Sequence, residues 1–213
     1  MTTEIFTIGH STHPIGKFLN LLGQHEIGAV ADVRSSPYSR FNPQFNREAL
    51  QKALVSAGIR YVFLGKELGA RSDDPSCYVH DKVQYDRLAK TALFQKGIER
   101  VSEGAGSYRV ALMCAEKDPL HCHRTILVAR ELIKLGMQIK HILPDGSLEP
   151  HAESIRRLRL ELGVPANDLF RSDEELVDES YAKQADRIAY DRSAARSKNY
   201  EEDAESAVSG VTR

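Results

Sequence analysis

The sequence predicts a three-layer α/β fold, with a mainly parallel sheet of about five strands flanked by helices and followed by a charged tail. Two observations support this prediction. Short apolar runs alternate along the chain with longer segments in which apolar residues recur at helical spacing. In addition, polar clusters follow several of the apolar runs directly, as loops do at the carboxyl edge of a parallel sheet. Strands that alternate with helices form parallel sheets covered on both faces.

Three strands are expected in the first part of the chain, at 5–8, 29–33 and 60–64. A helix between the first two begins near Pro14 and carries an apolar stripe from Phe18 to Leu22. A second helix, at 46–58, ends at a glycine. The segments 34–46 and 65–81 follow neither period. We expect ordered polar loops there, and for the first of them the density of aromatic residues and prolines argues against disorder.

The second part predicts helices at 85–103, 125–136 and 150–162, with strands at 110–113 and 138–143 and a turn at 144–147. Beyond Phe170 hydrophobicity falls, and the net charge changes from +3 up to that residue to −4 after it. We therefore expect an α/β domain at 1–165 and a charged tail at 166–213. The tail is expected to be helical around 173–190 and frayed or disordered beyond.

The composition limits the classes of function. A chain of 213 residues, 41% of them hydrophobic, suits one α/β domain with an appendage. A net charge of −1 gives no strong bulk attraction to nucleic acid or membranes. No apolar run approaches the about 18 residues of a membrane span, and the first residues lack the pattern of a signal peptide. With three cysteines and no disulfide framework, a reducing cytoplasm is the expected location.

Four polar clusters follow predicted strands, and they are Gly9–Thr12, Asp32–Ser36, Gly65–Gly69 and Cys114–Arg124. The carboxyl ends of parallel strands lie along one edge of a sheet, so these loops are expected to converge. This convergence predicts a functional site at that edge and depends on no single motif.

Cys114 follows a buried strand and is either a core thiol or a nucleophile in an anion-binding loop. Such loops close with an arginine about six residues further on, and that position is Leu120 here. Glu116 and Asp118 would also repel an anion. Cys122 precedes a predicted helix and has basic neighbours, which stabilise a thiolate, so we favour it as the nucleophile or redox thiol.

A metal site made by Cys114, Cys122 and His123 is the alternative, although the paired spacing of zinc motifs is missing. For His121 and His123 the other interpretation is helix capping at the surface.

Several arginines lie in or beside the converging loops, and Arg34, Arg40, Arg71 and Arg124 are expected to hold an anionic, phosphate-bearing or nucleotide-like substrate. Ordinary solvated charges are the alternative. Asp32, Glu116 and His10 are the candidate acids and bases. For the two carboxylates, pairing with an arginine that holds a loop is an equally strong interpretation.

Five motifs in order resemble a known family: Thr7-Ile-Gly-His-Ser11, Asp32-Val-Arg-Ser-x-Pro37, Ser39-Arg-Phe-x-Pro-x-Phe-Asn46, Glu67-Leu-Gly-x-Arg71 and Cys114-Ala-Glu-x-x-Pro-x-x-Cys-His-Arg124. They resemble the family catalogued as domain of unknown function 488, over about residues 5–145. The resemblance implies a prokaryotic intracellular protein with a three-layer α/β fold and supplies no reaction. The positions that it marks are His10, Ser11, Asp32, Arg34, Arg40, Arg71, Glu116, Cys122, His123 and Arg124.

The resulting hypothesis is an enzyme that acts on a small anionic or nucleotide-like substrate at the carboxyl edge of the sheet. Cys122 would be the nucleophile and Glu116, Asp32 or His10 the acid or base. The substrate would be bound by Ser11, Arg34, Arg40, Arg71, His123 and Arg124. The alternatives are an anion- or nucleic-acid-binding module without turnover, and a metal-binding protein using Cys114, Cys122 and His123. The sequence identifies no cofactor and no oligomeric state.

Overall fold

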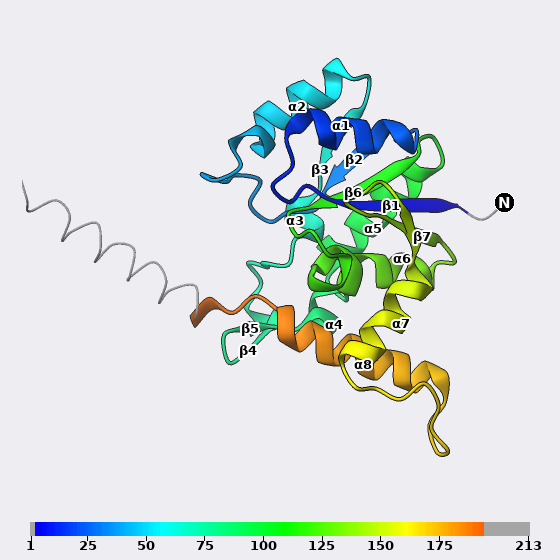
Figure 1. Ribbon diagram of the computed structural model, residues 1–213. Helices are drawn as coiled ribbons and strands as arrows, with labels where there is room; N and C mark the ends of the chain where they lie inside the picture. Colours follow the sequence, from blue (N-terminus) through cyan, green and yellow to red (C-terminus); the bar gives the residue numbers. More distant parts are fainter. Residues whose placement is uncertain (1–2, 194–213) are drawn as a thin grey trace, which may run out of the picture.

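The computed structural model describes residues 3–193 and shows a six-stranded sheet with helices on both faces (Figure 1). The strand order is β3-β2-β6-β1-β7-β8. Five strands run parallel, and they are β1 (Glu4–Gly9), β2 (Ala29–Asp32), β3 (Arg60–Phe63), β6 (Val110–Cys114) and β7 (Gln138–Ile142). The predicted α/β fold is confirmed. A short strand, β8 (Leu148–Pro150), adds an antiparallel edge beside β7.

Two helices cover one face of the sheet, α1 (Ile15–Gln24) and α2 (Arg47–Ser56) (Figure 1). Side chains of β1 alternate between the two faces. Phe6 and Ile8 pack in the core under α1 and α2, whereas Ile5 packs in the core on the other side. This alternation follows from the two-residue period of a strand, and it explains why the central strands are apolar throughout.

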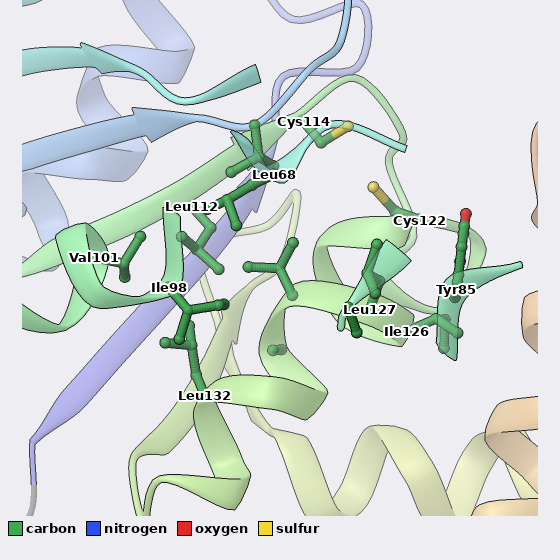
Figure 2. Packing of buried hydrophobic residues seen from close by; sticks show 14 of the residues in the cluster. Leu68, Tyr85, Ile98, Val101, Leu112, Cys114, Cys122, Ile126, Leu127 and Leu132 are labelled. Carbon is green, nitrogen blue, oxygen red and sulfur yellow. The ribbon is translucent and has the colours of Figure 1, made fainter. Parts of the chain in front are cut away.

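The opposite face is covered by α5 (Ala92–Ala105) and α6 (Arg130–Lys134), whose side chains interlock with those of β6 (Figure 2). The predicted helix at 85–103 is interrupted. The first part of it, α4, covers only Tyr85–Leu88. The second part is α5, and the Thr91 hydroxyl caps its start by accepting a hydrogen bond from the backbone amide of Phe94 at 3.2 Å. The helix expected at 125–136 begins as a π-helix, Arg124–Ala129, before α6.

The segment 65–81, expected to be a loop, contains the short helix α3 (Gly65–Leu68) and the strand β4 (Tyr78–Val79). β4 pairs with the next strand, β5 (Lys82–Val83), in an antiparallel hairpin. Gly65 allows this segment to pack closely on the loop after β2. A Cβ atom at Gly65 would lie 1.9 Å from the carbonyl oxygen of Arg34, closer than any real contact. The pattern of polar residues could not predict this packing, because the packing depends on the absence of a side chain at Gly65.

The last two helices are α7 (His151–Glu161) and α8 (Asp173–Ile188). Although α8 lies in the segment expected to be a tail, Leu176 and Tyr181 are buried, and the Gln184 amide donates to the carbonyl of Leu120 at 2.8 Å. Figure 1 shows α8 running toward β4 and β5. The disorder expected at the end of the chain falls largely on 194–213, which lie outside the described residues. Within 3–193 no helix combines the length and the apolar character that crossing a membrane requires.

Candidate functional site

The loops after β1 and β6 are joined by backbone hydrogen bonds at the carboxyl edge of the sheet. The amides of His10 and Ser11 donate to the carbonyls of Cys114 and Ala115, both at 2.9 Å. Gly9 makes this approach possible, because a Cβ atom there would lie 1.9 Å from the carbonyl oxygen of Glu116. The close packing fixes the turn that follows Cys114.

A pocket of about 240 Å³ opens at this edge, and it is lined by residues of the loops after β2, α3 and β6, of α4 and of the C-terminal segment. Its lining includes Arg34, Arg71, Cys114, Glu116, Cys122 and His123, all of which the sequence singled out. In the described part of the chain, the lining does not include His10, Ser11, Asp32, Arg40 or Arg124. The structure therefore brings about half of the candidate residues to one cavity and places the others behind or beside it.

Cys114, Cys122 and His123 form a buried group in the wall of the pocket, with their ligand atoms all within 4.8 Å of one another. His123 Nε2 lies 2.9 Å from the carbonyl oxygen of Val33. Because a carbonyl only accepts hydrogen bonds, Nε2 carries a proton, and Nδ1 is turned toward the sulfurs of Cys114 and Cys122, at 3.8 and 3.9 Å. Figure 2 shows both sulfur atoms at the edge of the core, directed into the same space.

The two thiols differ in acidity. Burial opposes ionisation of Cys122, but hydrogen bonding with Cys114 and the charges of Arg124 and His123 outweigh it and hold the pKa of Cys122 well below its ordinary value. The pKa of Cys114 is raised, first by its hydrogen bonding with Cys122 and then by burial. The pair therefore loses its first proton from Cys122. His123 lies against this thiolate, which raises the pKa of its imidazole although burial acts in the opposite direction.

Glu116 faces the same sulfurs. The residue as a whole is exposed, but its carboxyl group turns inward and accepts a hydrogen bond from the Cys114 thiol at 3.1 Å. Desolvation of the carboxyl group by its surroundings, followed by the negative charge of Cys122, raises the pKa of Glu116. The Cys114 proton can serve only one acceptor at a time, so Glu116 and Cys122 compete for it.

Arg124 is 1% exposed and is turned into the protein. Its guanidinium donates to the carbonyls of Glu116 at 2.8 Å and Lys117 at 3.4 Å, and to the Thr7 hydroxyl at 3.4 Å. Its donors thus hold the turn after Cys114 in place, and its charge acts on Cys122 through space.

Arg34 and Asp32 form a buried ion pair, with Nη2 and Oδ2 2.6 Å apart and Nε and Oδ1 2.9 Å apart. Asp32 also accepts a hydrogen bond from the Tyr61 hydroxyl at 2.9 Å. Of the two interpretations of Asp32 from the sequence, the observed contacts are those of an arginine partner that holds a loop. Arg34 still borders the pocket.

His10 is buried behind Arg34, stacked on Phe45 with 4.3 Å between ring centroids. Its Nδ1 donates to the Ser11 carbonyl at 2.8 Å, and its Nε2 accepts from Arg34 at 3.2 Å. Burial and the Arg34 charge lower the pKa of His10 to about 4, despite the hydrogen bond to Ser11. The imidazole is therefore neutral at pH 7. Ser11 has a left-handed backbone with φ of 48° and joins the β6 loop through its amide.

Residues 14–130 match the sequence profile of the family described as Domain of unknown function DUF488. This match spans more than half of the chain. The chain belongs to this family. The comparisons with curated proteins and with solved structures returned no match.

The DUF488 match contains every pocket residue from Arg34 to His123, but it ends before the last wall of the pocket. Ile188 and Tyr190 provide that wall. The Arg71 guanidinium lies 4.7 Å from the centre of the Tyr190 ring, and the Tyr190 carbonyl accepts from the Val83 amide at 2.9 Å. The site thus combines the DUF488 domain with a segment outside it.

Two aromatic residues of the pocket were missed in the sequence. Tyr85 is the first residue of the helix predicted at 85–103, and Tyr190 lies in a charged segment with no periodic signal. Arg40, in contrast, is exposed on the loop before Phe45. The DUF488 motif containing Arg40 carries no further signal that separates a pocket residue from a surface residue.

Proposed function

We propose that this DUF488 protein is a metal-dependent enzyme that holds Zn²⁺, or a similar divalent ion, with Cys114, Cys122 and His123 and acts on a small anionic substrate in the adjoining pocket. The observation that carries the proposal is the grouping of three ligand atoms within 4.8 Å, with the imidazole nitrogen turned toward both sulfurs. Thiolate and imidazole are the ligands that zinc prefers in proteins.

The distances support a tetrahedral site. With bonds of about 2.3 Å to sulfur and about 2.0–2.1 Å to nitrogen, sulfur and nitrogen ligands of a tetrahedral zinc ion lie about 3.6 Å apart. Nδ1 of His123 lies 3.8 and 3.9 Å from the two sulfurs, within a few tenths of an ångström of that separation. The hydrogen bond from Nε2 to Val33 fixes the required tautomer, as outer-shell partners of zinc-bound histidines do.

Three protein ligands leave a fourth coordination position, which is the pattern of catalytic zinc sites. Because all three side chains line the pocket, that position would face it. A zinc ion there lowers the pKa of water and polarises carbonyl or phosphoryl oxygens. Glu116, with its carboxyl group against Cys114 and its pKa raised, is suited to carry a proton to or from a bound substrate.

The pocket favours a compact anion. Arg71 borders it and supplies positive charge, and Arg34, which is paired with Asp32, also lies at its border. Its volume of about 240 Å³ is below the roughly 300–1,000 Å³ of pockets that enclose drug-sized ligands. A phosphate or carboxylate end of a substrate fits such a volume, whereas a whole nucleotide would extend beyond it.

The metal content of tag-free protein tests this proposal directly. We expect about one zinc ion per chain, and the substitutions Cys114→Ser, Cys122→Ser and His123→Gln should each weaken zinc binding by at least about 100-fold, because loss of even an outer-shell partner costs about 10–100-fold. Cys77→Ala is the matched control, since Cys77 is also a buried free thiol but lies outside the group. Stoichiometric zinc that survives Cys122→Ser would overturn the proposal, and so would wild-type protein that neither contains nor takes up zinc.

A second candidate function is thiol catalysis by Cys122 without a metal. The specific observation in its favour is the lowered pKa of Cys122, with His123 beside it as a proton carrier. It predicts that metal-free protein reacts with iodoacetamide at Cys122 faster than free cysteine does at pH 7. Protection by added zinc would support the metal centre, while fast alkylation unaffected by zinc would support the thiol enzyme.

A further inference from the structure

Tyr85, at the start of α4, has the position of a functional residue. Its side chain is 5% exposed, and it lines the same pocket as Cys114, Cys122 and His123. Figure 2 shows its hydroxyl at the end of a side chain that rises beside Cys122, toward the space that the two sulfurs face. The ring packs in the core, and its polar end is directed to the pocket.

The Tyr85 hydroxyl has no hydrogen-bond partner within residues 3–193. Several other tyrosines of the described residues have hydroxyl groups that are hydrogen-bonded within the protein. The hydroxyl of Tyr61 is bonded to Asp32 at 2.9 Å, and those of Tyr78 and Tyr181 to Ser72 and His151 at 2.7 and 2.5 Å. The hydroxyl is reached from the pocket that Tyr85 lines, so its hydrogen bond is available to whatever the pocket contains.

The surroundings determine what kind of partner this is. A tyrosine hydroxyl is protonated at neutral pH and can donate one hydrogen bond. Burial, and the negative charge that Cys122, Cys114 and Glu116 can carry, further oppose its ionisation. A protonated donor that faces a pocket bordered by Arg34 and Arg71 is suited to an oxygen atom that bears negative charge.

We propose that Tyr85 donates a hydrogen bond to the anionic oxygen that binds beside Cys114, Cys122 and His123, and that it stabilises the charge on this oxygen during the reaction. The inference rests on the proposed metal centre, whose fourth position would lie in the same pocket. It assigns a catalytic role to a residue that the family motifs do not contain. The ligand class is an oxyanion, either hydroxide or the carboxylate or phosphate group of a substrate.

Cobalt-substituted full-length protein provides the test, with inorganic phosphate as the probe. The visible spectrum of bound Co²⁺ reports on metal binding and geometry, and its change on addition of phosphate reports on anion binding. Tyr85→Phe removes the hydroxyl and keeps the ring. We expect this variant to bind Co²⁺ with an unchanged spectrum and to bind phosphate roughly tenfold more weakly or worse, as loss of a hydrogen bond to a charged group implies.

Tyr181→Phe is the control, because it removes a buried hydroxyl that lies outside this pocket and should leave phosphate affinity unchanged. Equal phosphate affinity in wild type and Tyr85→Phe would overturn the role of Tyr85 and leave the metal centre standing. A wild-type cobalt protein that does not respond to phosphate would do the same. Failure of the wild type to bind cobalt would overturn both proposals.

Discussion

Two buried groups of polar side chains in this protein differ in how completely their hydrogen bonds are satisfied. In the first, Cys114, Cys122 and His123 direct two sulfurs and one imidazole nitrogen at a common space beside the pocket. In the second, His141 and His151 form a chain between β7 and α8. His141 bonds to the Thr7 hydroxyl at 2.8 Å and to His151 at 3.1 Å, and His151 continues to Tyr181 at 2.5 Å.

Each ring nitrogen of the histidine chain has a partner, so this group connects the four elements β1, β7, α7 and α8 and offers no free ligand atom to a bound species. Both groups are buried and both contain histidine. Burial therefore does not distinguish the proposed metal-binding group from the histidine chain. What distinguishes them is that the first directs its sulfur and nitrogen atoms toward the pocket, whereas the second uses its nitrogen atoms for hydrogen bonds within the protein.

The first prediction is that zinc stabilises the fold through the cysteine group alone. Zinc at about 1,000 times its dissociation constant should raise the free energy of unfolding by roughly 4 kcal/mol. His123→Gln, with at least about 100-fold weaker binding, should reduce this gain to roughly 1.4 kcal/mol or less at the same zinc concentration, and His151→Phe should retain it even if its basal stability is lower. Thermal unfolding with and without zinc measures both effects. An equal response to zinc in His123→Gln and wild type would contradict the contrast.

The second prediction concerns pH and the histidine chain. Burial lowers the pKa of His151 from 6.5 to about 4, and burial followed by the nearby His151 lowers the pKa of His141. The unfolded chain therefore binds a proton at His151 below pH 6.5 that the folded protein does not accept until about pH 4. Stability is complete above pH 6.5 and falls between pH 6.5 and about 4, by roughly 3 kcal/mol from His151 alone.

Urea unfolding at a series of pH values measures this loss. His151→Phe should flatten the dependence by about the same amount, since the group that takes up the proton in the unfolded state is removed. If the unfolding free energy of His151→Phe falls with pH as steeply as that of wild type, groups other than His151 determine the pH dependence.

The third prediction concerns Thr7, which joins the two groups. Its hydroxyl oxygen bonds to His141 and accepts from Arg124. Thr7→Val keeps the shape of the side chain and removes both hydrogen bonds, so it should lower the free energy of unfolding by about 1–2 kcal/mol. Because Thr7 touches no ligand atom, zinc affinity should stay within about twofold of wild type. A large loss of zinc affinity would show that the two groups act as one network.

The fourth and smallest effect is expected for the exposed arginines. Arg71→Ala should weaken phosphate binding to the cobalt protein about threefold to fivefold, because Arg71 borders the pocket but remains exposed to solvent. Arg40→Ala is the matched comparison, and it should leave phosphate affinity unchanged since Arg40 does not contribute to the described lining of the pocket. Equal losses in both variants would point to a general effect of charge.

Sequence reasoning located the sheet and the convergence of loops because both follow from alternation and strand direction. It could not determine how each arginine is used. Arg34 and Arg124 are equally charged in the sequence, yet one borders the pocket and the other bonds to backbone carbonyls behind it. That distinction depends on the turn that Gly9 permits, and the sequence contains no periodic signal for such a turn.

The docking of α8 was missed for a different reason. Its buried face is a narrow stripe that includes Leu176, Ser180, Tyr181 and Gln184, set among charged residues. Two of these four side chains are polar, so the stripe has little hydrophobic contrast. A search for polar residues at helical spacing would have been needed to find it.

The wall formed by Ile188 and Tyr190 also has a consequence for synthesis of the chain. The ribosome produces all three proposed metal ligands more than sixty residues before it reaches Tyr190. A nascent chain can therefore form the sheet and present both thiols to the cell's metal-delivery and thiol-exchange systems while that side is still open. Docking of α8 then adds the final wall of the pocket, so the order of synthesis would let the proposed metal bind before that wall is in place.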